Sequence, residues 1–108
     1  MAEHTDIVAA WTTLPPEADA PAFARRLVED RVAACVTVQG PVLSFYRWQD
    51  VIEEETEQLI LIKTTRSLVA ALRERVLELH PYDVPELIVL PVIDGSPAYL
   101  RWVAESTR

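Results

Sequence analysis

The amino-acid sequence predicts an α+β fold in which two helices cover one face of a four-stranded antiparallel sheet. Apolar runs typical of strands alternate with segments of helical periodicity, in the order strand–helix–strand–strand–helix–strand, and a last helix follows. Only Gln49-Asp50 separates the two middle strands, so they form a hairpin. This order is the ferredoxin-like βαββαβ arrangement, here with an extended hairpin between the second and third strands and a C-terminal helix.

Length and composition indicate one folded domain, residues 1–108, with residues 1–5 as a flexible N-terminal tail. Half of the residues are hydrophobic and a quarter are charged, as in globular proteins. The formal net charge of −7 argues against nucleic acid as a partner, because phosphate binding needs clustered Lys and Arg.

The sequence carries no signal for a membrane or for export. No apolar run approaches the roughly 20 residues of a membrane span, and no lysine-rich amphipathic stretch suggests a membrane surface. The N-terminus, MAEHTDIV, lacks a basic segment followed by an apolar core. The single cysteine, Cys35, excludes an internal disulfide and fits a reducing compartment. A cytoplasmic location is therefore expected.

The first strand is expected at 6–12, closed by Pro15-Pro16. Asp19 is a suitable N-cap for a helix that runs from Ala20 to about Arg31. The apolar residues of this helix recur at helical spacing: Ala20, Phe23, Ala24, Leu27 and Val28.

The hairpin is expected to be unusually long. Strand-like composition runs over 32–38, bends at Gly40-Pro41, resumes over 42–48 and returns over 51–64. Arms of about 15 residues exceed the usual strand length of roughly 5–6, so they must project beyond a small core. The projecting part carries four glutamates, expected to be solvated: Glu53, Glu54, Glu55 and Glu57.

A second helix follows, with Ser67 as its expected cap and a buried face formed by Leu68, Val69, Leu72, Val76 and Leu79. The stretch HPYDVPE, residues 80–86, ends this helix because Pro81 and Pro85 bar its continuation. A fourth strand is expected at 87–93. Proline at the end of the turn 94–97 then starts the last helix.

The strands 59–62 and 87–90 are apolar in both alternation phases, so both faces of the sheet favour burial. In one small domain, a second apolar face indicates that sheets of several subunits pack together. The long hairpin arms could pair with sheet edges of neighbouring subunits.

Several motifs together resemble one family: AACV, W-x-x-x-I-E-E, IKT, HPY-x-VPE, LPV and YL-x-W. The chain resembles the CutA divalent-cation-tolerance family from the first strand nearly to the C-terminus. The resemblance implies a PII-like homotrimer with hairpins crossing between subunits. It also implies a role in tolerance of divalent metals, with copper usually named, through binding rather than catalysis. The chain departs from the family pattern at three points. Gln39 precedes Gly40, Arg47 interrupts the aromatic cluster, and the AACV cysteine is the only cysteine.

Four residues are candidate metal ligands: Cys35, His80, Asp83 and Glu86. The thiol of Cys35 suits Cu(I), although a small buried residue is the more frequent role of such a cysteine. His80 with Asp83 and Glu86 could form an imidazole–carboxylate site for Cu(II) or Zn(II), or His80 could cap its helix. Four aromatic residues could instead line a cleft between subunits: Trp48, Tyr82, Tyr99 and Trp102.

No enzyme is predicted, because the chain has no G-x-S-x-G, no H-E-x-x-H and no P-loop. A hydrolase built on Tyr82, His80 and Glu86 has only their closeness in sequence to support it. No organic cofactor is expected, and copper or another divalent cation is the expected ligand. The alternative is a PII-like signalling or scaffold trimer that binds a small anionic metabolite, with four candidate donors: Arg47, Lys63, Arg66 and Arg73.

Overall fold

The computed structural model describes residues 5–107 and confirms the predicted fold class. The elements are β1 (Ile7–Leu14), α1 (Ala20–Glu29), β2 (Cys35–Trp48), β3 (Val51–Thr65), a 3-10 turn η1 (Arg66–Leu68), α2 (Val69–Leu79), β4 (Ile88–Pro91) and α3 (Pro97–Ser106). Most of the predicted tail, including His4, lies outside the described residues. Thr5 lies within them, and its hydroxyl donates a hydrogen bond to the carbonyl of Val92.

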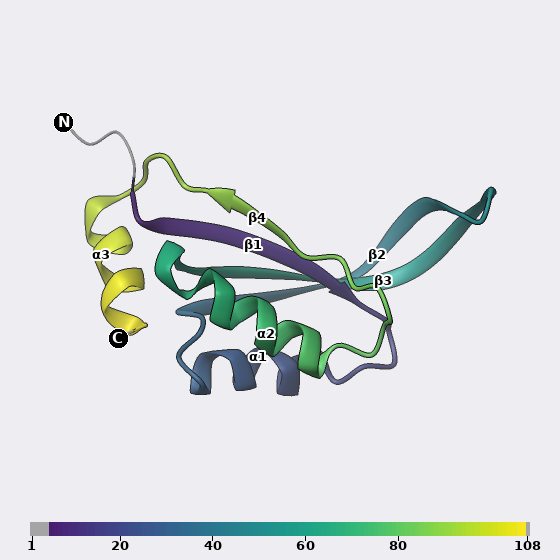
Figure 1. Ribbon diagram of the computed structural model, residues 1–108, viewed down its shortest axis with the longest axis horizontal. Coiled ribbons are helices and arrows are strands. Elements are labelled where there is room, and N and C mark those ends of the chain that lie inside the picture. Colours follow the sequence, from purple (N-terminus) through teal and green to yellow (C-terminus); the bar gives the residue numbers. More distant parts are fainter. Residues whose placement is uncertain (1–4, 108) are drawn as a thin grey trace.

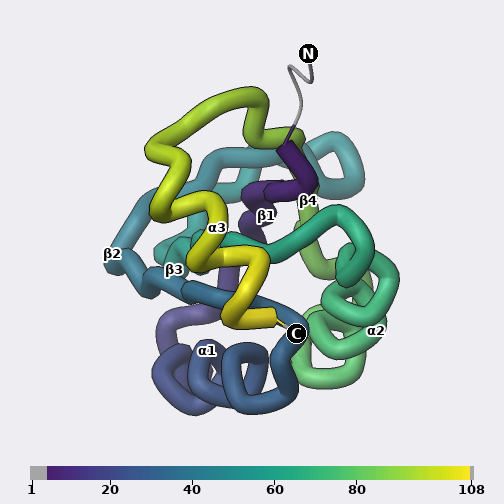
Figure 2. Tube along the Cα trace, turned by 90° about the vertical axis from the view of Figure 1, so that its left-hand side faces the viewer, coloured from purple at the N-terminus to yellow at the C-terminus, as the bar shows by residue number. Residues whose placement is uncertain are grey.

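One antiparallel sheet organises the molecule, in the strand order β2-β3-β1-β4. Helices α1 and α2 lie side by side on one face of this sheet, and α3 crosses the end of the sheet that lies away from the hairpin tip (Figures 1 and 2). The molecule measures 48 × 28 × 23 Å, elongated because the hairpin projects from it. None of the described helices is long and apolar enough to cross a membrane.

The core lies between the sheet and the pair α1 and α2. Alternate residues of the two central strands point toward these helices, since side chains alternate along a strand. The N-cap of α1 is Asp19, as predicted, with its carboxylate accepting from the Ala22 amide at 3.0 Å. The residues of this core are apolar and less than a tenth exposed: Ala10, Leu14, Phe23, Leu27, Ile60, Ile62, Leu72 and Val76, with Ala20, Val32 and Ala33.

The opposite sheet face is also apolar, as the sequence predicts. The register sets Trp11 beside Leu61 and Ile88, and Ala9 beside Leu90, all in the alternation phase that points away from α1 and α2. Ile88 and Leu90 are about two-fifths exposed in the single chain. We call this surface the open face. It leaves apolar side chains uncovered within one chain.

The hairpin projects because its partner strand ends. β1 stops pairing with β3 at Leu14, opposite Gln58, whereas β2 and β3 continue together to Trp48 and Val51. The pairing is irregular between Gln39 and Val42, at the predicted bend. Gln49 and Asp50 form the turn with positive φ of 50° and 66°, as a two-residue hairpin turn requires. Large apolar side chains are exposed on the projecting part: Leu43, Phe45, Trp48, Val51 and Ile52.

Four expectations for local structure differ from the observed elements. Ser67 is no helix cap but lies inside η1, where its hydroxyl is 3.2 Å from that of Thr65. The second strand begins at Cys35 rather than residue 32, because Arg31, two residues after the end of α1, has a φ of 60° and turns the chain. The fourth strand spans 88–91 rather than 87–93, since β1 offers it only four partners. β1 itself continues to Leu14, past the predicted end at residue 12, because its pairing with β3 continues there.

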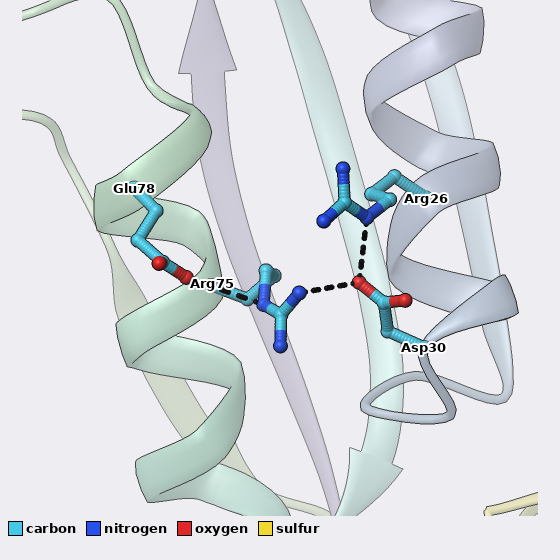
Figure 3. Close-up of polar contacts among 4 residues, drawn as sticks. All are labelled: Arg26, Asp30, Arg75 and Glu78. Carbon is cyan, nitrogen blue, oxygen red and sulfur yellow. Dashed lines mark hydrogen bonds and ion pairs between the residues drawn. The ribbon is translucent and has the colours of Figure 1, made fainter.

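An ion-pair network joins α1 to α2 (Figure 3). The carboxylate of Asp30 accepts from Arg26 Nε at 2.8 Å and from the Arg75 guanidinium at 2.7 Å. Arg75 Nε is also 3.3 Å from Glu78, an ion pair without hydrogen-bond geometry. Asp30 therefore ties the end of one helix to the middle of the other.

Candidate functional site

Residues 80–86, which we call the connector, run from the end of α2 past the base of the hairpin into β4 (Figure 1). His80 is the C-cap of α2, and its backbone amide donates a hydrogen bond to the Val76 carbonyl at 2.9 Å. A purely helix-capping role would require the ring to bond the last carbonyls of α2, but its partners are the Thr13 carbonyl and the Tyr82 amide. The ring is buried, and its Nε2 lies 2.6 Å from the Thr13 carbonyl oxygen on β1.

The other ring nitrogen of His80 is also engaged. The Tyr82 amide donates to His80 Nδ1 at 3.2 Å, so Nδ1 carries a lone pair. The carbonyl oxygen of Thr13 can only accept, so Nε2 carries the proton. These two partners assign His80 to the neutral Nε2–H tautomer.

Tyr82 reaches from the connector to the base of the hairpin. Its hydroxyl donates to the Glu57 carboxylate on β3 at 3.1 Å, and its ring lies 4.9 Å from that of His80. Burial, and then this bond to Glu57, raises the pKa of the Tyr82 phenol. A phenolate beside a carboxylate would bring two negative charges together.

Glu57 corrects the expectation that all four hairpin glutamates are solvated. Its side chain is buried, at 7 % exposure, whereas Glu54 and Glu55 are exposed and Glu53 is half-buried. Within residues 5–107, Glu57 forms no ion pair, and Tyr82 is its hydrogen-bond donor. Its burial follows from its place opposite Val42, at the bend, where the connector covers it.

The second half of the connector is tied to the open face. Glu86 accepts a hydrogen bond from Trp11 Nε1 at 2.9 Å. Asp83 is exposed, and within residues 5–107 it forms no ion pair. Among the described residues, the connector thus presents near the surface one carboxylate with a hydrogen bond, Glu86, and one without, Asp83.

Cys35 lies at the opposite end of the sheet, beside α3. It is half-buried and pairs directly with Lys63 of β3. The Lys63 ammonium lies 5.4 Å from the ring centroid of Tyr99, and the Tyr99 ring lies 5.6 Å from that of Trp102. Hydrogen bonding to Tyr99, and then the neighbouring thiol, raises the pKa of Lys63.

The fold therefore separates the predicted metal ligands into two groups. Cys35 lies at the start of β2, and the other three lie on the connector, where His80 and Glu86 already have partners. Within residues 5–107, no three His, Cys, Asp or Glu side chains gather in a way that could hold a metal ion. One chain does not assemble this ligand set, and the metal role of the four residues stays a prediction.

The predicted cleft aromatics are also distributed. Trp48 lies at the hairpin tip and Tyr82 at its base, while Tyr99 and Trp102 lie on α3. All four are between 37 and 53 % exposed in the single chain, so they could contribute to surfaces between chains. A cleft between subunits stays a prediction.

The polar network at the connector includes two residues that sequence analysis does not single out, Trp11 and Thr13. Neither has a local signal, because each acts through a partner more than 60 positions away. The burial of Glu57 had no local signal, because it shares the alternation phase of Leu59 and Leu61, which belongs to the open face.

A shallow hollow of about 500 Å³ lies where β3 passes into α2, and Arg66 lines it together with Asp6, Thr65, Ser67, Leu68, Ala104 and Thr107. The other predicted anion donors lie elsewhere. Arg47 is at the hairpin tip, Arg73 is exposed on α2, and Lys63 is held against Tyr99. One chain does not gather the four.

Comparisons with known proteins match nearly the whole chain. The model of the family "CutA1 divalent ion tolerance protein" covers residues 8–106. "Divalent-cation tolerance protein CutA" of Thermus thermophilus is 46% identical over 95 residues, which cover 88% of this chain and 92% of that protein. "Protein CutA" of Mus musculus is 48% identical over 102 residues, 94% of this chain and 58% of that longer protein.

Solved structures share the fold closely. CutA from Xylella fastidiosa superposes with a TM-score of 0.92 at 39% identity, covering 96% of this chain and 100% of that one. The CutA1 protein of Thermus thermophilus gives 0.90 at 43% identity, covering 94% and 99%. These matches confirm the resemblance found in the sequence motifs.

Proposed function

Because the chain belongs to the CutA1 divalent ion tolerance family, we propose that it binds divalent cations as a non-catalytic homotrimer. The chain spans little more than half of the mouse relative, so this proposal concerns the domain in hand. Copper is the cation proposed first, and the motif resemblance is the reason for naming it.

The observation that carries the assembly is the apolar open face. Trp11, Leu61 and Ile88 lie together on a sheet surface that the described helices leave partly uncovered. The projecting hairpin adds further exposed apolar side chains, among them Leu43 and Phe45. Uncovered apolar area of this kind favours association, because its removal from water stabilises the assembly by about 25 cal/mol per Å².

The donors proposed for the cation are the thiol of Cys35 and the carboxylates of Asp83 and Glu86. Cys35 is half-buried and Asp83 is exposed, so both are reachable. A thiolate prefers soft Cu(I), whereas carboxylate oxygens also accept harder divalent ions. Since one chain holds these groups apart, we propose that a cation is shared between chains of the trimer.

The acidic balance of the chain supports cations over anions. The net charge of −7 attracts positive ions to the surface and repels phosphates. Ligand binding by the alternative, a PII-like sensor for a small anionic metabolite, would centre on the hollow beside Arg66. We rank it second because the other candidate donors are dispersed.

Sedimentation equilibrium and calorimetry test the proposal together. Sedimentation should give three times the chain mass of 12.2 kDa. Copper titration should give binding in wild type that weakens in Cys35→Ser, or in Asp83→Asn combined with Glu86→Gln. Glu105→Gln is the matched control, since it removes one exposed carboxylate on α3.

A monomer at micromolar concentration would contradict the assembly, and unchanged copper binding in both variants would exclude the proposed donors. A thermal-shift screen of metal ions against nucleotides and inorganic phosphate separates the two functions, because a ligand of the folded form raises its melting temperature. Stabilisation by phosphate that Arg66→Gln abolishes would favour the sensor.

A further inference from the structure

We infer that His80 is a positioning residue that holds the connector across the hairpin base, with both ring nitrogens committed to the chain's own backbone, and that it is not a metal ligand. The contacts that assign this role lie within one chain and do not depend on the proposed function.

The ring of His80 is held on several sides. Nε2 donates to the Thr13 carbonyl of β1, and Nδ1 accepts from the Tyr82 amide of the connector. The ring of Phe23 on α1 meets it edge-on, with centroids 6.4 Å apart. At 8 % exposure the ring has little contact with water, so each of its nitrogens depends on these protein partners.

A metal ion needs a ring nitrogen with a free lone pair. The lone pair in the neutral Nε2–H tautomer is on Nδ1, and the Tyr82 amide occupies it. A metal at Nδ1 would displace this amide and leave a donor without its partner, while a metal at Nε2 would displace the Thr13 bond. The residues present therefore do not fit a metal centre at His80.

The same geometry gives His80 a positive role. By fixing the Tyr82 amide and packing against the Tyr82 ring, it sets where the phenol hydroxyl lies. That hydroxyl bonds buried Glu57 on β3. A continuous series of contacts thus runs from β1 through His80 and Tyr82 to β3, at the point where the hairpin leaves the sheet.

The tautomer can be read by nitrogen NMR. In a His4→Gln variant His80 is the only imidazole, so long-range nitrogen–proton correlations report on it alone. We expect a protonated Nε2 and an unprotonated Nδ1 at neutral pH, unchanged when Zn²⁺ is added in excess. Protonation of both nitrogens, or a metal-induced change in the Nδ1 resonance, would overturn the inference.

Two substitutions separate positioning from general stability. Asn at position 80 can present an oxygen near the place of Nδ1, whereas Gln can present an amide donor near the place of Nε2. We expect hydrogen exchange of the Tyr82 amide to rise about fivefold in His80→Gln and to stay closer to wild type in His80→Asn. Equal exchange of the Tyr82 amide in the two variants would contradict the positioning role. The NMR test on His4→Gln does not require either position-80 variant to fold.

Discussion

The hydroxyl of Tyr82 lies 3.1 Å from the carboxylate of Glu57, and this hydrogen bond joins the connector after α2 to the base of the β2–β3 hairpin. The two residues are 25 positions apart and belong to segments that share no strand pairing. The bond supplies a donor to a carboxylate that the fold has removed from water. The stability of the folded protein should therefore change when the Tyr82 phenol is removed or when it ionises.

Removal of the Tyr82 hydroxyl should destabilise the protein. Tyr82→Phe leaves the buried Glu57 without its hydrogen bond, which should lower the free energy of unfolding by about 1–2 kcal/mol in urea denaturation. Tyr46→Phe is the matched control, because Tyr46 donates to Glu55 at 2.7 Å on the exposed hairpin. It should cost less than about 0.5 kcal/mol. Equal losses in the two variants would contradict the burial argument.

Alkaline pH should weaken the folded state through the tyrosines. The hydrogen bond to Glu55 raises the pKa of Tyr46 to about 12, and burial raises that of Tyr82, both from an ordinary 10.0. A raised folded-state pKa stabilises the protonated form, so its contribution is complete below pH 10 and is lost as pH rises through the folded-state pKa.

The measurement for this prediction is melting temperature between pH 8 and 11, with phenolate absorbance recorded alongside. Tyr82→Phe should lose less stability than wild type over this range, because it lacks one of the two shifted phenols. The same loss in both proteins would show that Tyr82 does not contribute.

The contact between α1 and α2 should depend on Asp30. Asp30→Asn removes the charge that Arg26 and Arg75 share, and the free energy of unfolding should fall by about 0.5–1 kcal/mol. These side chains are partly exposed, so the loss should shrink in concentrated salt. Glu78→Gln is the control and should be nearly neutral, since its pair with Arg75 lacks hydrogen-bond geometry. A loss that did not change with salt would contradict an ionic origin.

A charge on the open face should prevent assembly. Leu61→Asp places a carboxylate beside Trp11 in the middle of the sheet, and burying it between chains would cost several kcal/mol. Sedimentation should then report dissociated or unfolded chains. Leu77→Asp, on the exposed side of α2, should leave the assembly intact. An intact assembly in Leu61→Asp would place the interface elsewhere.

The sequence alone determined the elements and much of their arrangement. The two-residue spacer Gln49-Asp50 predicted the hairpin, and apolar residues in both phases of 59–62 predicted the open face. Asp19 was identified as a cap because a helix N-terminus needs an acceptor within a few residues. These features depend on local periodicity and local hydrogen bonding, which a single sequence displays.

Only the tertiary structure decided what the polar side chains do. His80 bonds a carbonyl of β1, Glu57 is covered by the connector, and Cys35 lies at the other end of the sheet from His80. Each of these facts depends on strand register and on the path of the connector, which bring together residues 25 to 75 positions apart. Hydrogen bonds over such separations carry no periodic trace along the chain, and only the packed fold determines them.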